Sequence, residues 1–289
     1  MIDDKKIEDL ENIAKQIRID IVKMTTNANS GHPGGSLGSA DIFTCLYFAG
    51  IMKYDAKQPN WPNRDYFILS NGHICPVWYA TLSQAGSIEY DELLTFRKLD
   101  SRLQGHPTKS FLPFVEISTG SLGQGIGAAV GLSIGLRIKE MKNRVFCSVG
   151  DGELEEGSTW EAAMAASHYN CSNLIVFCDR NGLQQNGNTE DIIGLEPLSE
   201  KYRAFGWNVL ETDGNNIQKI IEAFEQAKLS KNKPTIIFFK TLMGKGVDFM
   251  ENDYQWHGKP LPEDLAQKAL DILNSEKNLP NPPIPQKNQ

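Results

Sequence analysis

The chain has 289 residues, 40% of them hydrophobic, and a formal net charge of −7 at pH 7. This composition is typical of a soluble globular protein with a full apolar core. The acidic balance argues against a nucleic-acid or membrane-surface partner, but phosphorylated ligands remain possible because local groups bind them.

The N-terminus and the cysteines predict a cytoplasmic protein. Residues 1–20 form a charged, amphipathic helical pattern rather than a signal peptide, and no apolar run is long enough to span a bilayer. The five cysteines show no CxxC spacing, which fits a reducing compartment. Cys147 and Cys178 fall within apolar runs, so we expect them in the core.

Helical and strand-like patterns alternate along the chain. Helices are expected at 4–28, 40–49, 75–85, 120–141, 158–169, 198–205, 216–230 and 265–273. Strands are expected at 66–69, 145–149, 174–178, 207–211 and 235–240, with a weak strand at 114–118. This alternation predicts an α/β domain over residues 1–275, with helices on both faces of a doubly wound, mostly parallel sheet. Residues 276–289 are rich in Pro, Asn and Gln and are expected to form an extended or disordered tail.

Four of the five histidines lie in Gly/Pro-containing turns beside expected elements: His32, His73, His106 and His257. Taken singly, each is more simply a structural or exposed loop residue. Their repeated placement at element ends favours a shared site. His168 falls within an expected helix, so we interpret it as structural. The glycine-rich stretch 29–36 is expected to be a loop, with Ser36 capping the next helix.

A glycine-rich turn opens the expected helix 120–141. Gly123, Gly125 and Ala128 match the dinucleotide-binding pattern GxGxxA, so a Rossmann-type oxidoreductase is one alternative. The weak preceding strand disfavours it. Gly127, Gly131 and Gly135 recur every fourth residue, which predicts a close helix-packing face or a subunit interface.

The stretch 145–181 reads as a βαβ unit with polar groups at the ends of both strands. Gly150-Asp151-Gly152 follows the first strand, and Asn181 follows the second. The ends of parallel strands are where open α/β sheets bind ligands. Glycines allow a diphosphate close to the backbone, and Asp and Asn oxygens suit Mg²⁺. The simpler alternative is a turn in which Asp151 only caps a helix.

Seven motifs in chain order resemble the N-terminal half of transketolase over roughly residues 10–270: GHPGGSLGSADI, LSNGH, GHP, TGSLGQGIG, GDGELEEG, DRNGLQQNG and WHGKPL. The chain is most similar to the separately encoded N-terminal subunit of split transketolases, because it ends where a fused enzyme would continue. Gly35-Ser36 and Glu153 depart from many fused enzymes and resemble the split subgroup.

The resemblance implies a fold that binds thiamine diphosphate, with Mg²⁺ as the metal and Ca²⁺ or Mn²⁺ as substitutes. The implied metal ligands are the side chains of Asp151 and Asn181 and the carbonyl of Leu183. The implied cofactor-binding residues are His73, Gly120, Ser121, Leu122, Gly150, Asp151, Gly152, Glu156, Asn181 and His257. The implied catalytic residues are His32, His106, His257 and Glu156, the last reaching across an interface toward the activating glutamate of the other domain.

The implied activity is transfer of a two-carbon ketol unit from a ketose (phosphate) to an aldose (phosphate), with the pentose phosphate pathway as the leading assignment. Histidines suit the proton transfers of such a reaction. The activating carboxylate and the phosphate-gripping groups belong to the family's second domain. We therefore expect the chain to be inactive without a C-terminal transketolase subunit, with which it would form a heterotetramer. An unphosphorylated or unusual sugar remains open.

Two other functions remain as alternatives. One is a related thiamine enzyme, either a deoxyxylulose phosphate synthase or a component of a 2-oxo acid dehydrogenase. The GHPGG and WHGKPL loops favour transketolase instead, because they supply sugar-facing histidines. The other is a non-catalytic thiamine-binding or regulatory subunit, which the presence of all four turn histidines disfavours.

Overall fold

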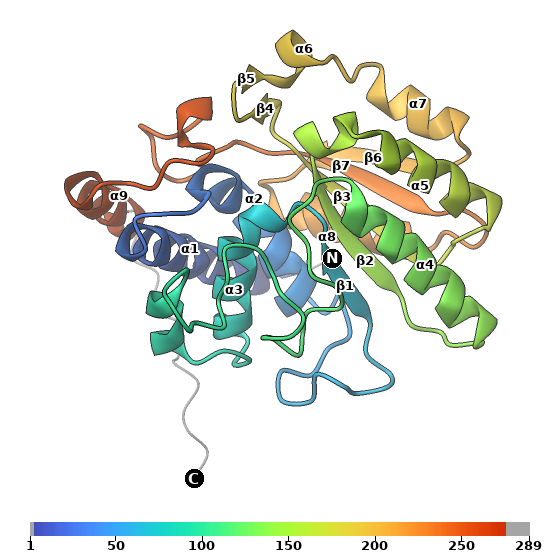
Figure 1. Cartoon of the computed structure of the whole chain (residues 1–289), viewed down its shortest axis with the longest axis horizontal. Coiled ribbons are helices and arrows are strands. Elements are labelled where there is room, and N and C mark those ends of the chain that lie inside the picture. Colours follow the sequence, from blue (N-terminus) through green and yellow to red (C-terminus); the bar gives the residue numbers. More distant parts are fainter. Residues whose placement is uncertain (1–2, 276–289) are drawn as a thin grey trace.

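A five-stranded parallel sheet forms the centre of the molecule in a computed structural model that describes residues 3–275. The strand order is β1-β2-β3-β7-β6, and helices cover both faces (Figure 1). The predicted doubly wound α/β fold is confirmed. The sheet strands are β1 (Tyr66–Leu69), β2 (Val145–Gly150), β3 (Leu174–Arg180), β6 (Asn208–Asp213) and β7 (Thr235–Lys240). A separate two-stranded sheet consists of β4 (Leu183–Gln184) and β5 (Gly187–Asn188).

The α-helices connect these strands and flank the sheet. They are α1 (Asp4–Asn27), α2 (Pro33–Phe48), α3 (Cys75–Gln84), α4 (Gln124–Ile138), α5 (Gly157–His168), α6 (Thr189–Ile192), α7 (Leu198–Ala204), α8 (Ile217–Lys228) and α9 (Glu263–Ser275). Short 3₁₀ turns are η1 (Gly72–Ile74), η2 (Tyr90–Thr95), η3 (Gly152–Glu155) and η4 (Tyr254–Trp256). None of the helices in the described part of the chain is long and apolar enough to cross a membrane.

The central strands are apolar throughout because both of their faces are buried. On one face, Phe146, Phe177 and Phe239 pack with side chains of α1, α2, α3 and α8. On the other face, Val176 and Phe238 pack with side chains of α4, α5 and α7. Cys147 and Cys178 belong to this second cluster and are fully buried, as predicted.

The expected loop at 29–36 is wrong at its second half. Helix α2 begins at Pro33, because proline is well suited to the first helical position, where no backbone N–H is needed. Ser36 is therefore inside the helix rather than its cap, and its hydroxyl donates to the carbonyl of His32 at 2.7 Å. His32 itself is the N-cap residue of α2.

Other boundaries also differ from the predictions. Residues 114–118 form no strand, and α4 begins only at Gln124, after Gly123 turns the chain at φ +79°. Strand β3 continues to Arg180, two residues beyond its predicted end. A side chain added at Gly127, Gly131 or Gly135 would meet nothing within 4 Å, so other described residues do not pack against this glycine stripe. The expected tail at 276–289 lies outside the described residues.

The strand register determines where the functional loops lie. Leu69 pairs with Ser148, Gly150 with Asp179, and Arg180 with Lys240. Because all these strands run in the same direction, the loops that follow β1, β2, β3 and β7 emerge side by side at one edge of the sheet.

Candidate active site

A cavity of about 400 Å³ opens at the carboxyl edge of the sheet. Its wall contains residues of the loops after β1, β2 and β3, the N-terminus of α2, the turn before α4, and the segment after η4. The lining residues with proposed roles are His32, His73, Gly120, Leu122, Gly150, Asp151, Gly152, Asn181, Leu183 and His257. Ten predicted site residues, from separate parts of the chain, thus share one cavity.

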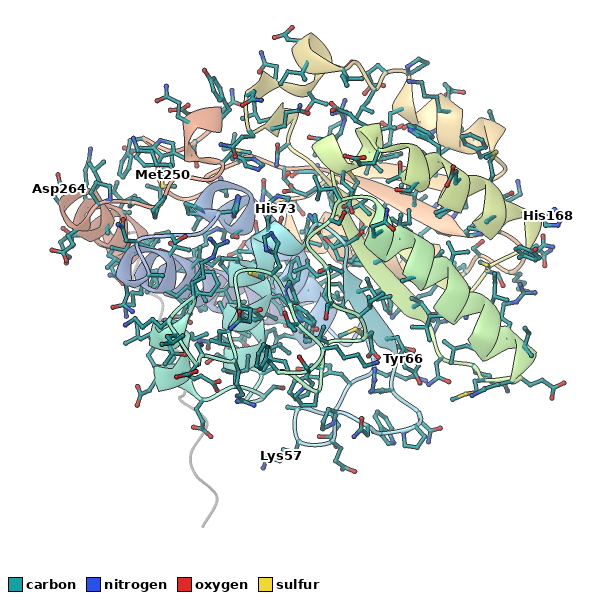
Figure 2. The ribbon with its side chains drawn as sticks, in the orientation of Figure 1. Lys57, Tyr66, His73, His168, Met250 and Asp264 are labelled. Atoms are coloured by element: carbon teal, nitrogen blue, oxygen red, sulfur yellow. The ribbon has the colours of Figure 1, made fainter. Side chains whose placement is uncertain are left out.

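Three histidines form a triangle in this cavity. The ring centroids of His32 and His73 are 5.1 Å apart, those of His32 and His257 are 5.6 Å apart, and those of His73 and His257 are 5.2 Å apart. Figure 2 shows His73 in the interior of the fold, whereas His168 lies at the outer edge, at the end of α5. The expectation that His168 stands apart from the site agrees with this placement.

Glycines allow the histidine-bearing loops to approach one another. A Cβ added at Gly34 would lie 2.8 Å from the carbonyl oxygen of Trp256, which is closer than real contacts allow. A Cβ at Gly258 would lie 3.4 Å from the ring of His32. The glycines of the GHPGG and WHGKP motifs are therefore required for packing.

The environment keeps these histidines neutral. Burial, followed by the charges of His257 and Arg97, lowers the pKa of His32 to about 3. Burial also lowers the pKa of His73 well below its usual value, and lowers the pKa of His257. A neutral imidazole carries one N–H donor and one acceptor nitrogen. The triangle can therefore both donate hydrogen bonds to substrate oxygens and accept them.

His106 borders the cavity without lining it. A Cβ added at Gly120, where φ is +148°, would lie 3.2 Å from the ring of His106. Burial and the nearby Arg97 lower the pKa of His106. His106 therefore contacts the turn that carries Gly120 and Leu122, and it lies behind that part of the wall.

The predicted metal ligands lie in another part of the cavity wall, just after the ends of β2 and β3. The Nη1 atom of Arg180 donates to Oδ1 of Asp151 at 2.9 Å, and the Gly182 N–H donates to Oδ2 at 2.6 Å. Burial raises the pKa of Asp151 to about 7, against the lowering effect of Arg180. Asn181 Oδ1 accepts the N–H of Leu183 at 2.9 Å.

This donor set suits magnesium better than zinc. No group of three or more His, Cys, Asp or Glu side chains within residues 3–275 could hold a metal ion. One carboxylate, one amide oxygen and one carbonyl are instead the partial set that Mg²⁺ accepts when phosphate oxygens and water complete its octahedron. Asp151, Asn181 and Leu183 fit that description.

Unpartnered polar atoms show that the cavity is suited to a polar ligand. Buried polar atoms in proteins normally have hydrogen-bond partners. Several that lack one belong to cavity-lining residues, namely His32 Nδ1, Asn71 Oδ1, Glu155 Oε1, Gln184 Oε1 and His257 Nδ1. A bound group with both donors and acceptors, such as an aminopyrimidine with a diphosphate, would satisfy them.

Glu153 is a structural residue of the site that the sequence analysis noted only as a departure. Its Oε1 accepts the Ser70 hydroxyl at 2.5 Å and the Gly123 N–H at 2.9 Å, and its Oε2 accepts the Gly150 N–H at 3.3 Å. It is buried, and burial raises its pKa to about 7. One carboxylate thus joins three loops of the cavity wall. A second acid directly after the GDG turn was the available signal.

The glycines of the 120–127 turn serve packing rather than dinucleotide binding. A Cβ at Gly125 would lie 2.6 Å from the Cα of Ser70, and one at Gly123 would overlap Oγ of Ser158. Helix α4 therefore begins directly against the end of β1 and the start of α5. This contact removes the need for the Rossmann alternative.

Two predicted site residues lie outside the cavity wall. Glu156 is exposed at the N-cap of α5, and Ser121 is exposed in the turn before α4. Glu155, not Glu156, lines the cavity. Asp179 and Gln184 also line it and were not predicted; Asp179 accepts from Asn181 Nδ2 at 3.0 Å and from the Thr241 hydroxyl.

Comparisons with known proteins agree with this geometry. Residues 10–278 match the family model "Transketolase, thiamine diphosphate binding domain". The chain is 40% identical to transketolase-like protein 2 of Bos taurus, over 98% of this chain and 46% of that protein. It is also 40% identical to the first of the lettered subunits of apulose-4-phosphate transketolase from Actinobacillus succinogenes, over 93% of this chain and 97% of that protein.

A crystal structure of transketolase from Campylobacter jejuni superposes with a TM-score of 0.88 at 34% identity, over 97% of this chain and 45% of that one. The chain thus spans about half the length of the first curated relatives that it matches, and nearly all of the Actinobacillus succinogenes protein. The chain belongs to the transketolase family and corresponds to its thiamine diphosphate-binding domain.

Proposed function

We propose that this chain is the thiamine diphosphate-binding subunit of a split transketolase. It would transfer a two-carbon ketol unit from a ketose (phosphate) to an aldose (phosphate), together with a separate C-terminal subunit. The observation that carries this proposal is the triangle of neutral histidines that shares one cavity with Asp151 and Asn181. The near-complete match to one subunit of the Actinobacillus succinogenes enzyme supports the split organisation.

In this proposal, Asp151, Asn181 and the carbonyl of Leu183 hold Mg²⁺, for which Ca²⁺ or Mn²⁺ can substitute. The remaining contacts to thiamine diphosphate come from backbone and side-chain groups of the cavity wall and its rim: His73, Gly120, Ser121, Leu122, Gly150, Gly152, Glu156 and His257. When bound, the cofactor supplies a nucleophilic carbon and an electron sink for breaking and forming C–C bonds.

The histidines would handle protons during the transfer. His32 and His257 lie in the triangle, and His106 lies behind the adjacent turn. Their lowered pKa values keep them uncharged at neutral pH, so each can accept a proton from a sugar hydroxyl and return it to a carbonyl oxygen. The same N–H groups would stabilise negative charge on those oxygens.

The partner would complete the site. Glu156 lies exposed at the rim, where a second subunit could reach it, which supports its proposed role beside the activating carboxylate of the partner. We propose a heterotetramer with two copies of each subunit. We also propose a cytoplasmic enzyme, since all five cysteines are buried and free of disulfides. The pentose phosphate pathway is the leading context, and the sugar in the name of the Actinobacillus succinogenes relative is a second candidate substrate.

Reconstitution tests this function. The purified chain is mixed with the product of a neighbouring reading frame that carries a pyrimidine-binding domain, and ketol transfer is followed with thiamine diphosphate and Mg²⁺. We expect turnover from the mixture and none from either protein by itself. Full activity of this chain without the partner would contradict the proposal, as would a stable complex that binds the cofactor and transfers no ketol unit from any ketose phosphate.

A further inference from the structure

Arg180 occupies an unusual position between the predicted metal ligand and a segment outside the cavity. It is the last residue of β3, and its side chain is 14% exposed. One nitrogen of the guanidinium, Nη1, donates to Asp151 at 2.9 Å. The other, Nη2, donates to both Glu190 and Glu196 at 2.9 Å. Arg180 does not itself line the cavity.

The two glutamates organise the 187–198 segment, which comprises β5, α6 and the connection to α7. Glu190 accepts the N–H groups of Leu195 at 3.2 Å and Glu196 at 3.4 Å. Glu196 accepts the N–H of Leu198 at 2.8 Å. In Figure 1 this segment runs along the upper edge of the molecule toward α7. Its backbone conformation therefore depends on the two carboxylates that Arg180 holds.

The three contacts of Arg180 are not equivalent. The side chains of Glu190 and Glu196 are 45% and 58% exposed, and exposed ion pairs contribute little by themselves. Asp151 is 1% exposed, so its pairing with Arg180 is well shielded from solvent. A guanidinium is planar and rigid, and fixing one of its nitrogens fixes the direction of the other. The buried contact with Asp151 therefore orients the donor that the glutamates share.

We propose that Arg180 is a positioning residue that couples the Asp151 carboxylate to the conformation of the 187–198 segment. The connection works in both directions: Asp151 orients the guanidinium, and the segment holds the guanidinium against Asp151. The inference rests on the proposed function insofar as Asp151 binds the metal ion. Lysine cannot replace arginine here, because a single ammonium nitrogen cannot contact Asp151 and the glutamates in this fork geometry.

Hydrogen exchange measured by mass spectrometry on the full-length chain tests the coupling. In Arg180→Lys, peptides covering 187–198 should exchange at least about tenfold faster than in the wild type. Asp151→Asn should also accelerate exchange there, because it removes the ionic partner of Arg180 without touching the segment. Arg203→Lys is the matched control, since Arg203 also bridges two glutamates, Glu200 and Glu211, and should leave 187–198 unchanged.

Magnesium affinity gives a readout that a purely structural arginine would not affect. In the reconstituted complex with excess thiamine diphosphate, calorimetric titration of Arg180→Lys with Mg²⁺ should show a Kd raised about fivefold or more. The charge is retained, so the change reports orientation. If Arg180→Lys does not fold, Glu196→Gln, which weakens one segment contact, should show the same two effects at smaller size.

The outcomes separate this inference from the proposed function. Wild-type exchange in the 187–198 segment of both Arg180→Lys and Asp151→Asn overturns the coupling, and so does a wild-type Mg²⁺ Kd in Arg180→Lys. A wild-type complex that binds no Mg²⁺ overturns the metal assignment, whereas faster exchange in Asp151→Asn would still support the coupling.

Discussion

The histidine side and the carboxylate side of the cavity respond differently to the same physical effect. Burial favours the neutral form of every ionisable group. For His32 the neutral form, reached by a pKa of about 3, is the useful one. For Asp151, whose pKa rises to about 7, the ionised form needed for metal binding requires a nearby cation. Arg180 supplies one cation, and the proposed Mg²⁺ supplies a second. One wall is functional as folded, and the other awaits its ion.

The largest expected effect concerns the carboxylate wall. Asp151→Ala in the reconstituted complex should reduce Mg²⁺-dependent binding of thiamine diphosphate by about 100-fold or more, because a directly coordinating carboxylate is lost. Equilibrium titration of the cofactor with and without Mg²⁺ measures this. The control is Asp271→Ala, an exposed position on α9. Unchanged, metal-dependent binding in Asp151→Ala would remove the basis for the comparison between the walls.

The histidine wall should affect rate more than cofactor affinity. His257→Gln should lower kcat by roughly 100-fold to 10,000-fold, as expected for the loss of a general acid–base group. Its cofactor affinity should fall much less than that of Asp151→Ala, because the metal ligands remain. His168→Gln, at the far end of α5, serves as the control with unchanged kcat. Equal kcat in both variants would show that the triangle has no role in proton transfer.

Packing at the histidine loops can be tested separately from chemistry. Gly34→Ala should lower the free energy of unfolding by about 1–3 kcal/mol, because the new Cβ would meet the carbonyl of Trp256 at 2.8 Å. Gly127→Ala, on the open face of α4, should instead raise it by up to about 1 kcal/mol through higher helix propensity. Urea denaturation of the isolated chain measures both. Equal effects would mean that the two helical glycines have similar surroundings.

The smallest expected effect concerns pH. Between its folded pKa of about 3 and an ordinary value of 6.5, His32 stays neutral in the native state while the unfolded chain takes up the proton. Its contribution to stability is therefore complete above pH 6.5 and decreases as the pH falls, by up to about 1.4 kcal/mol per pH unit. The plot of unfolding free energy against pH from 6.5 to 4 should be shallower for His32→Asn than for the wild type. Parallel plots would contradict the lowered pKa.

Local patterns predicted those parts of the fold that depend on local physics. The run 235–240 is apolar and β-branched enough to identify β7 to the residue, and the glycine and proline turns identified the three histidines of the triangle. The start of α2 was missed because glycines lower helix propensity, whereas tertiary packing against the loop of Trp256 requires them there.

Long-range contacts could not be predicted in the same way. Glu153 is identified as a clasp only when Ser70, 83 residues away, is seen beside it. The link between Arg180 and Asp151 depends on β3 continuing two residues farther than its apolar run indicates. The exposed position of Glu156, one residue from the lining Glu155, depends on where η3 ends and α5 begins. Such one-residue distinctions arise from register, which is a property of the assembled sheet.

The direct pairing of Gly150 with Asp179 places the two candidate metal ligands, Asp151 and Asn181, each at a fixed offset from one rung of the backbone ladder. Their spacing is therefore inherited from peptide geometry shared by all parallel sheets, and it does not depend on the length or composition of the surrounding loops. Evolution can remodel those loops to admit a different sugar while the anchor for the cofactor stays in place.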